Sequence, residues 1–182
     1  MTVLLTGCGG GQSDEEKIAE VIETSATSTD PQDCPRLTTL AYREQTQHAE
    51  VSDAKRLCRE DARETENDPT SVEVSGVRIK GDKATADVAY IGGIFDGQTM
   101  AVALVKRNDA WKMDEVTGFS RFDRARLVRA MSASLSMGPG AFRPEVATCL
   151  EGVFAELPRP KLEEIVIGDS VVPFEELVVG CT

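Results

Sequence analysis

Apolar residues recur along this chain with two different periods, and the changes of period divide it into three segments. From residue 13 to residue 66 the spacing is helical, and three helices are expected there. The first begins at Ser13-Asp14-Glu15-Glu16, a capping box that satisfies free backbone N–H groups. The second is short and begins at Asp33. The third runs from about Ser52 to Glu66, which leaves Gln45 to His48 as a loop.

The period changes to two at Ser71, as is typical of strands with one buried face. The alternation slips at Ser75-Gly76 and then resumes, and such a slip at a glycine indicates a β-bulge. Turns are expected at Gly81-Asp82, Asp96-Gly97 and Asn108-Asp109, which leave four strands between and around them. The expected fold class is therefore α+β, with three N-terminal helices packed on a curved four-stranded antiparallel sheet.

Residues 120–182 return to helical spacing and show no strand pattern. We expect a small all-helical module there, following a domain formed by residues 13–119. A core built from about 60 residues is thin, so a covalent cross-link within it makes physical sense.

The run Leu4-Leu5-Thr6-Gly7-Cys8 resembles the lipobox of bacterial lipoproteins. The resemblance implies that Cys8 carries a lipid and that residues 1–12 are the end of a signal followed by a flexible glycine-rich tether. An export signal needs a positive start and an apolar stretch of about 7–15 residues, so we expect the numbering to begin inside a longer signal. The expected location is the outer face of the bacterial cytoplasmic membrane. The alternative is a cytosolic protein in which this run occurs by chance.

With Cys8 lipidated, four of the five cysteines remain. Each lies on the apolar face of an expected helix, and we predict the pairs Cys34–Cys58 and Cys149–Cys181. The alternative is four reduced, buried cysteines that act as small hydrophobic residues. The spacings fit no zinc motif and the chain has a single histidine, so neither a metal nor a cofactor is expected.

The order of three helices and a curved antiparallel sheet resembles the nuclear-transport-factor-2-like (NTF2-like) superfamily, and more closely its secreted bacterial lipoproteins of unknown function. The resemblance covers residues 8–118 and rests on these runs: the lipobox at Cys8, Asp33-Cys34, Cys58-Arg59-Glu60, Ser71-Val72-Glu73-Val74, Gly81-Asp82-Lys83-Ala84-Thr85, Asp96-Gly97-Gln98-Thr99 and Trp111-Lys112-Met113-Asp114. It implies a cone in which helices close over the sheet. It implies no single activity, because the superfamily includes isomerases, dehydratases and binding modules.

Enzymes of this superfamily place an Asp, His or Tyr inside the cone. The resemblance therefore implies Asp87, Tyr90 and Asp114 as pocket candidates, with Trp111 as a large aromatic wall. The alternative is that these side chains point outward or have structural roles. The histidine, His48, lies in a polar run and is expected to be solvated.

The net charge of −11 argues against nucleic acid as a partner, because phosphates would be repelled. Four arginines, Arg121, Arg124, Arg126 and Arg129, interrupt this acidity. We expect them to pair with the acidic first domain; the alternative is contact with lipid headgroups or an acidic partner.

No catalytic motif emerges from these patterns. The expected function is a non-enzymatic module that binds a small-molecule ligand or a partner protein, and the alternative is a small-molecule enzyme of the isomerase or dehydratase kind. Residues 100–105 are apolar on both faces of their strand. The second face is either a homodimer surface or lies under the C-terminal helices, and we expect the latter.

Overall fold

The computed structural model describes residues 11–49, 51–62, 68–137, 141–168 and 172–182. The lipobox and Cys8 lie outside the described residues, as does the expected end of the third helix at Glu66.

Four helices precede the sheet, whereas three were predicted. They are α1 (Asp14–Thr27), α2 (Asp33–Leu37), α3 (Leu40–Gln47) and α4 (Val51–Asp61). The predicted capping box is present at the start of α1, where Ser13 and Glu16 each accept the other's backbone N–H.

The expected loop at Gln45 to His48 is wrong, because residues 45–47 belong to α3. The Thr39 side chain caps this helix by accepting from Tyr42 N, and His48 ends it in the left-handed conformation. The inward position of α3 is occupied by Arg43, which is 7% exposed. A buried arginine interrupts the apolar stripe, so the periodicity did not indicate a helix.

The sheet confirms the α+β class and the predicted antiparallel order β1-β2-β3-β4. Its strands are β1 (Ser71–Lys80), β2 (Lys83–Ile91), β3 (Thr99–Arg107) and β4 (Ala110–Arg121). The bulge predicted at Ser75-Gly76 is confirmed by a register shift between Ser75 and Arg78, and Gly76 has φ +61°. The β3–β4 register shifts three times, which curves the sheet around the helices.

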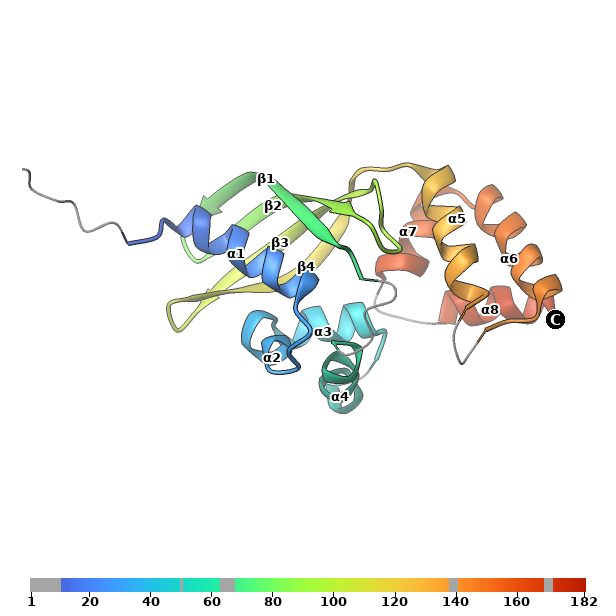
Figure 1. The fold of residues 1–182 in the computed structure, drawn as a ribbon, viewed down its shortest axis with the longest axis horizontal. Coiled ribbons are helices and arrows are strands. Elements are labelled where there is room, and N and C mark those ends of the chain that lie inside the picture. Colours follow the sequence, from blue (N-terminus) through green and yellow to red (C-terminus); the bar gives the residue numbers. More distant parts are fainter. Residues whose placement is uncertain (1–10, 50, 63–67, 138–140, 169–171) are drawn as a thin grey trace, which may run out of the picture.

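Helix α1 lies across one face of the sheet, which we call the inner face (Figure 1). The alternating strand residues on this face form the core with Ile18 and Ile22 of α1, both at most 1% exposed. The buried strand residues are Val72, Ala84, Ala86, Val88, Met100, Val102, Leu104, Trp111, Met113, Val116 and Phe119.

The edge of β4 is paired by residues of the helices in place of a fifth strand. Thr39 N donates to Met113 O at 2.8 Å. Six residues farther along the chain, in α3, Gln45 Nε2 donates to Val116 O and Gln45 Oε1 accepts from Val116 N, each at 2.8 Å. The Gln45 amide therefore substitutes for the backbone of a neighbouring strand.

The same edge is paired farther along by α7. Arg159 Nη2 donates to Phe119 O at 2.6 Å, and Glu163 Oε1 accepts from Phe119 N at 3.4 Å. Gln45 Nε2 also donates to Ile167 O at 2.8 Å, so one amide links α3, β4 and α7.

Four helices follow the sheet: α5 (Arg124–Leu135), α6 (Pro144–Glu156), α7 (Arg159–Ile167) and α8 (Val172–Cys181). Their buried residues, including Leu127, Leu150, Phe154 and Leu162, belong to the same apolar cluster as the inner face of the sheet. The division into residues 13–119 and 120–182 stays a prediction.

The C-terminal helices do not cover the outer face of the sheet, so that expectation is wrong. They lie beyond one end of the sheet, where α7 contacts β4 (Figure 1). Ala101 and Ala103, on the outer side of β3, are small enough to be half-buried by their cross-strand neighbours Asp87 and Thr85.

Two of the four arginines near residue 125 make internal contacts. Arg126 pairs with Asp96 of the β2–β3 connection at 3.5 Å. Arg124 Nη1 donates to Leu157 O at 2.5 Å and caps the end of α6. Arg121 and Arg129 are exposed.

Both predicted cysteine pairs lie at disulfide distance. Cys34 joins Cys58 across α2 and α4, and Cys149 joins Cys181 across α6 and α8, with Cα–Cα separations of 6.1 and 5.7 Å. Disulfides persist in oxidising compartments, so these two indicate an extracytoplasmic environment. In the described part of the chain, no helix has the length and apolar character needed to cross a membrane.

Candidate functional site

A cavity of about 330 Å³ lies between the inner face of the sheet and the helices α1–α4. We call it the first cavity. Its sheet side is apolar, with Met100, Met113 and Val116, whereas the end of α1 contributes the small side chains of Ser25 and Ala26. The cavity reaches the surface beside Asp30 and Thr46, which line it and are themselves exposed.

A second cavity of about 310 Å³ adjoins the first on the side of the C-terminal helices. Both are lined by Thr46, Ile94, Phe95 and Val166. The remaining wall of the second cavity comes from His48, Met131, Ile165 and Phe174. The C-terminal helices therefore contribute to the wall of the second cavity.

The β2–β3 connection supplies two of the shared walls. Gly92, Gly93 and Gly97 have positive φ angles, and Gly92 N donates to the Asp96 carboxylate at 2.8 Å. This is the turn chemistry that the sequence indicated. The tight loop holds Ile94 and Phe95 against both cavities.

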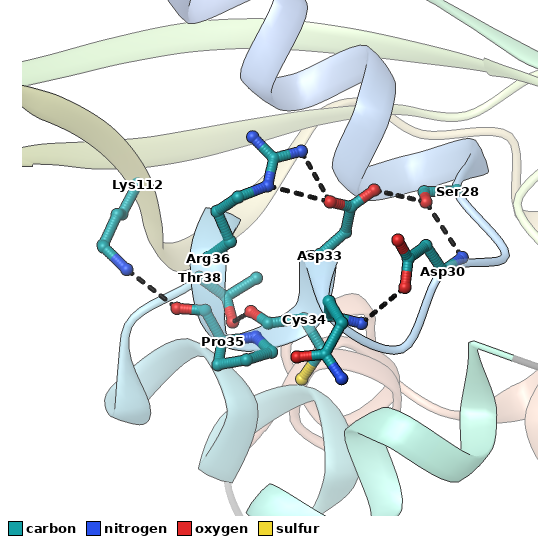
Figure 2. Close-up of polar contacts among 9 residues, drawn as sticks. Ser28, Asp30, Asp33, Cys34, Pro35, Arg36, Thr38 and Lys112 are labelled. Carbon is teal, nitrogen blue, oxygen red and sulfur yellow. Dashed lines mark hydrogen bonds and ion pairs between the residues drawn. The ribbon is translucent and has the colours of Figure 1, made fainter.

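The polar side of the first cavity is organised around Asp33, at the start of α2. Figure 2 shows its carboxylate between Ser28 Oγ, which donates to Oδ2 at 2.5 Å, and Arg36, which donates through Nε and Nη2 at 2.9 and 2.5 Å. The hydrogen bonds from Ser28 and Arg36 lower the pKa of Asp33 below its usual range. Asp33 is therefore an ionised, fully engaged structural group.

Tyr90, on the inner face of β2, is the predicted pocket residue that lines the first cavity. Its ring meets Phe95 edge-on, with centroids 5.7 Å apart, and its hydroxyl makes no hydrogen bond to a described residue. Burial raises the pKa of Tyr90 far above its ordinary value, and the neighbouring Tyr42 adds to the shift. The hydroxyl therefore stays protonated and can donate or accept one hydrogen bond.

The structure does not bring the other three pocket candidates to this cavity. Asp87 alternates with the buried Ala86 and Val88, so it faces the outer side, where its Oδ2 approaches the bulge at Gly76. Asp114 is half-buried at a register shift of β4 and is not part of either described lining.

Trp111 lies on the inner face, but at the opposite end of α1. It is 2% exposed, and Lys106 Nζ lies 5.5 Å from the centre of its ring. Lys106 also binds the Asp14 carboxylate at 2.9 Å. We call this group, Asp14, Lys106 and Trp111, the filled end of the inner face; the hollow end is the part around Tyr90 and the first cavity.

His48 differs from its expected role as a solvated loop residue. It is half-buried at the end of α3 and lines the second cavity. The polar run that contains His48 shows no helical periodicity, so no local pattern indicated this position.

The arrangement suits binding better than proton transfer. Asp33 is held ionised by Ser28 and Arg36, and Tyr90 is held protonated by burial, so neither is poised to exchange a proton near neutral pH. Among the described residues, no group of three or more His, Cys, Asp or Glu side chains has the arrangement to hold a metal ion.

No protein-family model matches the chain, and comparisons with curated proteins and with solved structures find no match either.

Proposed function

We propose that this protein is a lipid-anchored, extracytoplasmic binding protein with an NTF2-like cone that takes up a small, mainly apolar molecule. The observation that carries the proposal is the first cavity, whose volume is within the range of small-molecule sites. Such sites are mostly apolar with a few polar groups that fix orientation, and Tyr90 is a group of this kind. The resemblance of residues 8–118 to NTF2-like lipoproteins supports the same location for a ligand.

The anchor belongs to the same proposal. The lipobox run ending at Cys8 and the two disulfides both suit a protein exported across the cytoplasmic membrane. Two acyl chains on one cysteine hold a protein stably on a bilayer, where one chain binds only marginally. Expressed with its full signal, Cys8→Ala should release the protein from the membrane fraction; a variant that stays membrane-bound at wild-type size would argue against the anchor.

Binding is tested with a neutral fluorescent dye such as Nile red, in the Cys8→Ala protein. Ser25→Phe places a ring in the first cavity, whereas Thr27→Phe, two residues along α1, adds the same ring at an exposed site outside the described lining. We expect Ser25→Phe to weaken dye binding at least about tenfold, because it removes the space the ligand needs. Thr27→Phe should leave it unchanged. Equal affinity in both variants would contradict the proposed site.

The alternative hypothesis, a small-molecule enzyme of the isomerase or dehydratase kind, has no comparable support. Its candidate carboxylates, Asp87 and Asp114, lie away from the cavity, and Asp33 is committed to Ser28 and Arg36. Asp87→Ala and Asp114→Ala should therefore leave ligand binding as in the wild type.

A further inference from the structure

The two cavities are adjacent and share part of their walls. Four of the eight residues described around the second cavity also line the first: Thr46, Ile94, Phe95 and Val166. Each cavity alone is at the lower limit for a small-molecule site, at about 330 and 310 Å³. A molecule that passes between these shared walls would occupy both.

The described linings of both cavities contain no lysine and no arginine. Three carboxylates, Asp30, Asp33 and Asp68, line the first cavity. An anionic head group would lie near these charges without a cationic partner, which costs binding free energy.

Asp33 does not require a cationic ligand, because it is already paired with Arg36, and the charge of the exposed Asp30 is screened by solvent. Asp33 binds Ser28 and Arg36, and Asp30 Oδ1 accepts from Gln32 N at 2.8 Å. Asp68 also has a partner. Among the described lining residues, Tyr90 offers a hydroxyl for which no hydrogen bond is found, at the aromatic wall formed with Phe95.

We propose that the ligand is an elongated, uncharged amphiphile: one hydroxyl or carbonyl group binds Tyr90, and an apolar chain passes Thr46 into the second cavity. This inference rests on the proposed binding function and specifies its ligand class.

Three probes test it in the full chain carrying Cys8→Ala: hexanol, tetradecanol and tetradecanoate, each displacing Nile red. Eight extra methylene groups favour tetradecanol over hexanol by at least about 100-fold if the chain is accommodated. Tetradecanoate has the same chain with an anionic head and should bind at least about tenfold more weakly than tetradecanol.

Thr46→Trp closes the passage between the cavities at an exposed position of α3, and Ala41→Trp adds the same side chain on an exposed part of that helix outside both linings. We expect Thr46→Trp to reduce the tetradecanol preference at least about tenfold and to retain hexanol binding. Ala41→Trp should behave as the wild type. Tyr90→Phe should weaken both alcohols about three- to tenfold, the value of one hydrogen bond.

The outcomes separate the two proposals. Dye binding with equal affinities for hexanol and tetradecanol would overturn the elongated ligand and leave the binding function standing, as would a tetradecanol preference untouched by Thr46→Trp. Tetradecanoate binding as tightly as tetradecanol would overturn the neutral head group. Binding of neither the dye nor any probe would overturn the binding function itself.

Discussion

The two ends of the inner face show how one layer of helix on sheet can be solid at one end and hollow at the other. At the filled end, Trp111 lies under Lys106 and beside Asp14, and the indole occupies the space between α1 and the sheet. At the hollow end, α1 presents Ser25 and Ala26 toward the sheet, and a cavity of about 330 Å³ remains. The large side chain of Trp111 on β4 at one end, and the small side chains of Ser25 and Ala26 on α1 at the other, therefore decide where the space is.

A hollow costs stability because its walls lose dispersion contacts. At the hollow end, a disulfide and side-chain hydrogen bonds offset this loss. The Cys34–Cys58 disulfide lines the first cavity, as does Gln45, which joins α3 to β4 and α7. The filled end depends on apolar packing, with one ion pair at its surface.

The largest difference between the ends should appear on truncation of an aromatic side chain. Trp111→Ala at the filled end should lower the free energy of unfolding by about 3–5 kcal/mol, because it opens a cavity in a packed core. Tyr90→Ala enlarges a cavity that already exists, so its loss in the free energy of unfolding should be clearly smaller than that of Trp111→Ala. Urea unfolding followed by circular dichroism measures both values. Equal losses would mean that Tyr90 is packed as tightly as Trp111.

The next largest loss in the free energy of unfolding should follow from removal of a disulfide. Double alanine variants of Cys34–Cys58 and of Cys149–Cys181 should each lose about 3 kcal/mol, because closed loops with separations of 24 and 32 residues gain entropy when opened in the unfolded chain. The first pair lines the cavity and the second does not. We therefore expect weaker dye binding in the first variant alone, at a temperature where both are folded. Equal binding losses would mean that the Cys34–Cys58 bond has no specific role in the first cavity.

Much of the fold could be predicted from the sequence, because it rests on local periodicity. The capping box at Ser13, the bulge at Gly76 and the four strands all follow from patterns within a few residues. Tyr90, which the resemblance implied as a pocket residue, lines the first cavity and follows the buried alternation of Ala84, Ala86 and Val88.

What could not be predicted depends on contacts distant in sequence. The burial of Arg43 in α3 is accommodated by hydrogen bonds from its Nη1 to Thr38 O and Oγ1, at 3.2 and 3.3 Å. The position of Asp114 depends on successive register shifts in β4, which no turn residue marks. The second cavity requires α7 and α8 beside the β2–β3 loop, and nothing in the local pattern fixes that packing.

A smaller effect should follow from loss of the Gln45 amide, which pairs the β4 edge at the hollow end. Gln45→Leu keeps the approximate volume but leaves Val116 N and O and Ile167 O without this partner, so we expect a loss of about 2 kcal/mol. Ala41→Leu, on an exposed part of the same helix, is the control and should change stability little. Hydrogen exchange should rise at Val116 N–H in Gln45→Leu. An unchanged exchange rate there would show that the edge is protected by another group.

The smallest effect belongs to the ion pair of the filled end. The hydrogen bond from Lys106 lowers the pKa of Asp14 below 3.8, and the same bond raises the pKa of Lys106 above 10.5. A lowered carboxyl pKa contributes stability that is present above the unfolded pKa and is lost as pH falls through the folded one. A raised lysine pKa contributes stability that is present below the unfolded pKa and is lost as pH rises through the folded one.

The Asp14–Lys106 pair should therefore make a constant contribution to folding stability between about pH 5 and 9, and a smaller one at lower or higher pH. The contribution is modest because solvent screens both groups. Lys106→Met should return the pKa of Asp14 toward 3.8, as measured by the NMR titration of its carboxyl carbon. Lys17 lies 3.8 Å from the same carboxylate but without the hydrogen bond, so Lys17→Met should move that pKa less. Equal shifts in the two variants would mean that net charge near α1, and not the bond to Lys106, holds Asp14 ionised at the filled end.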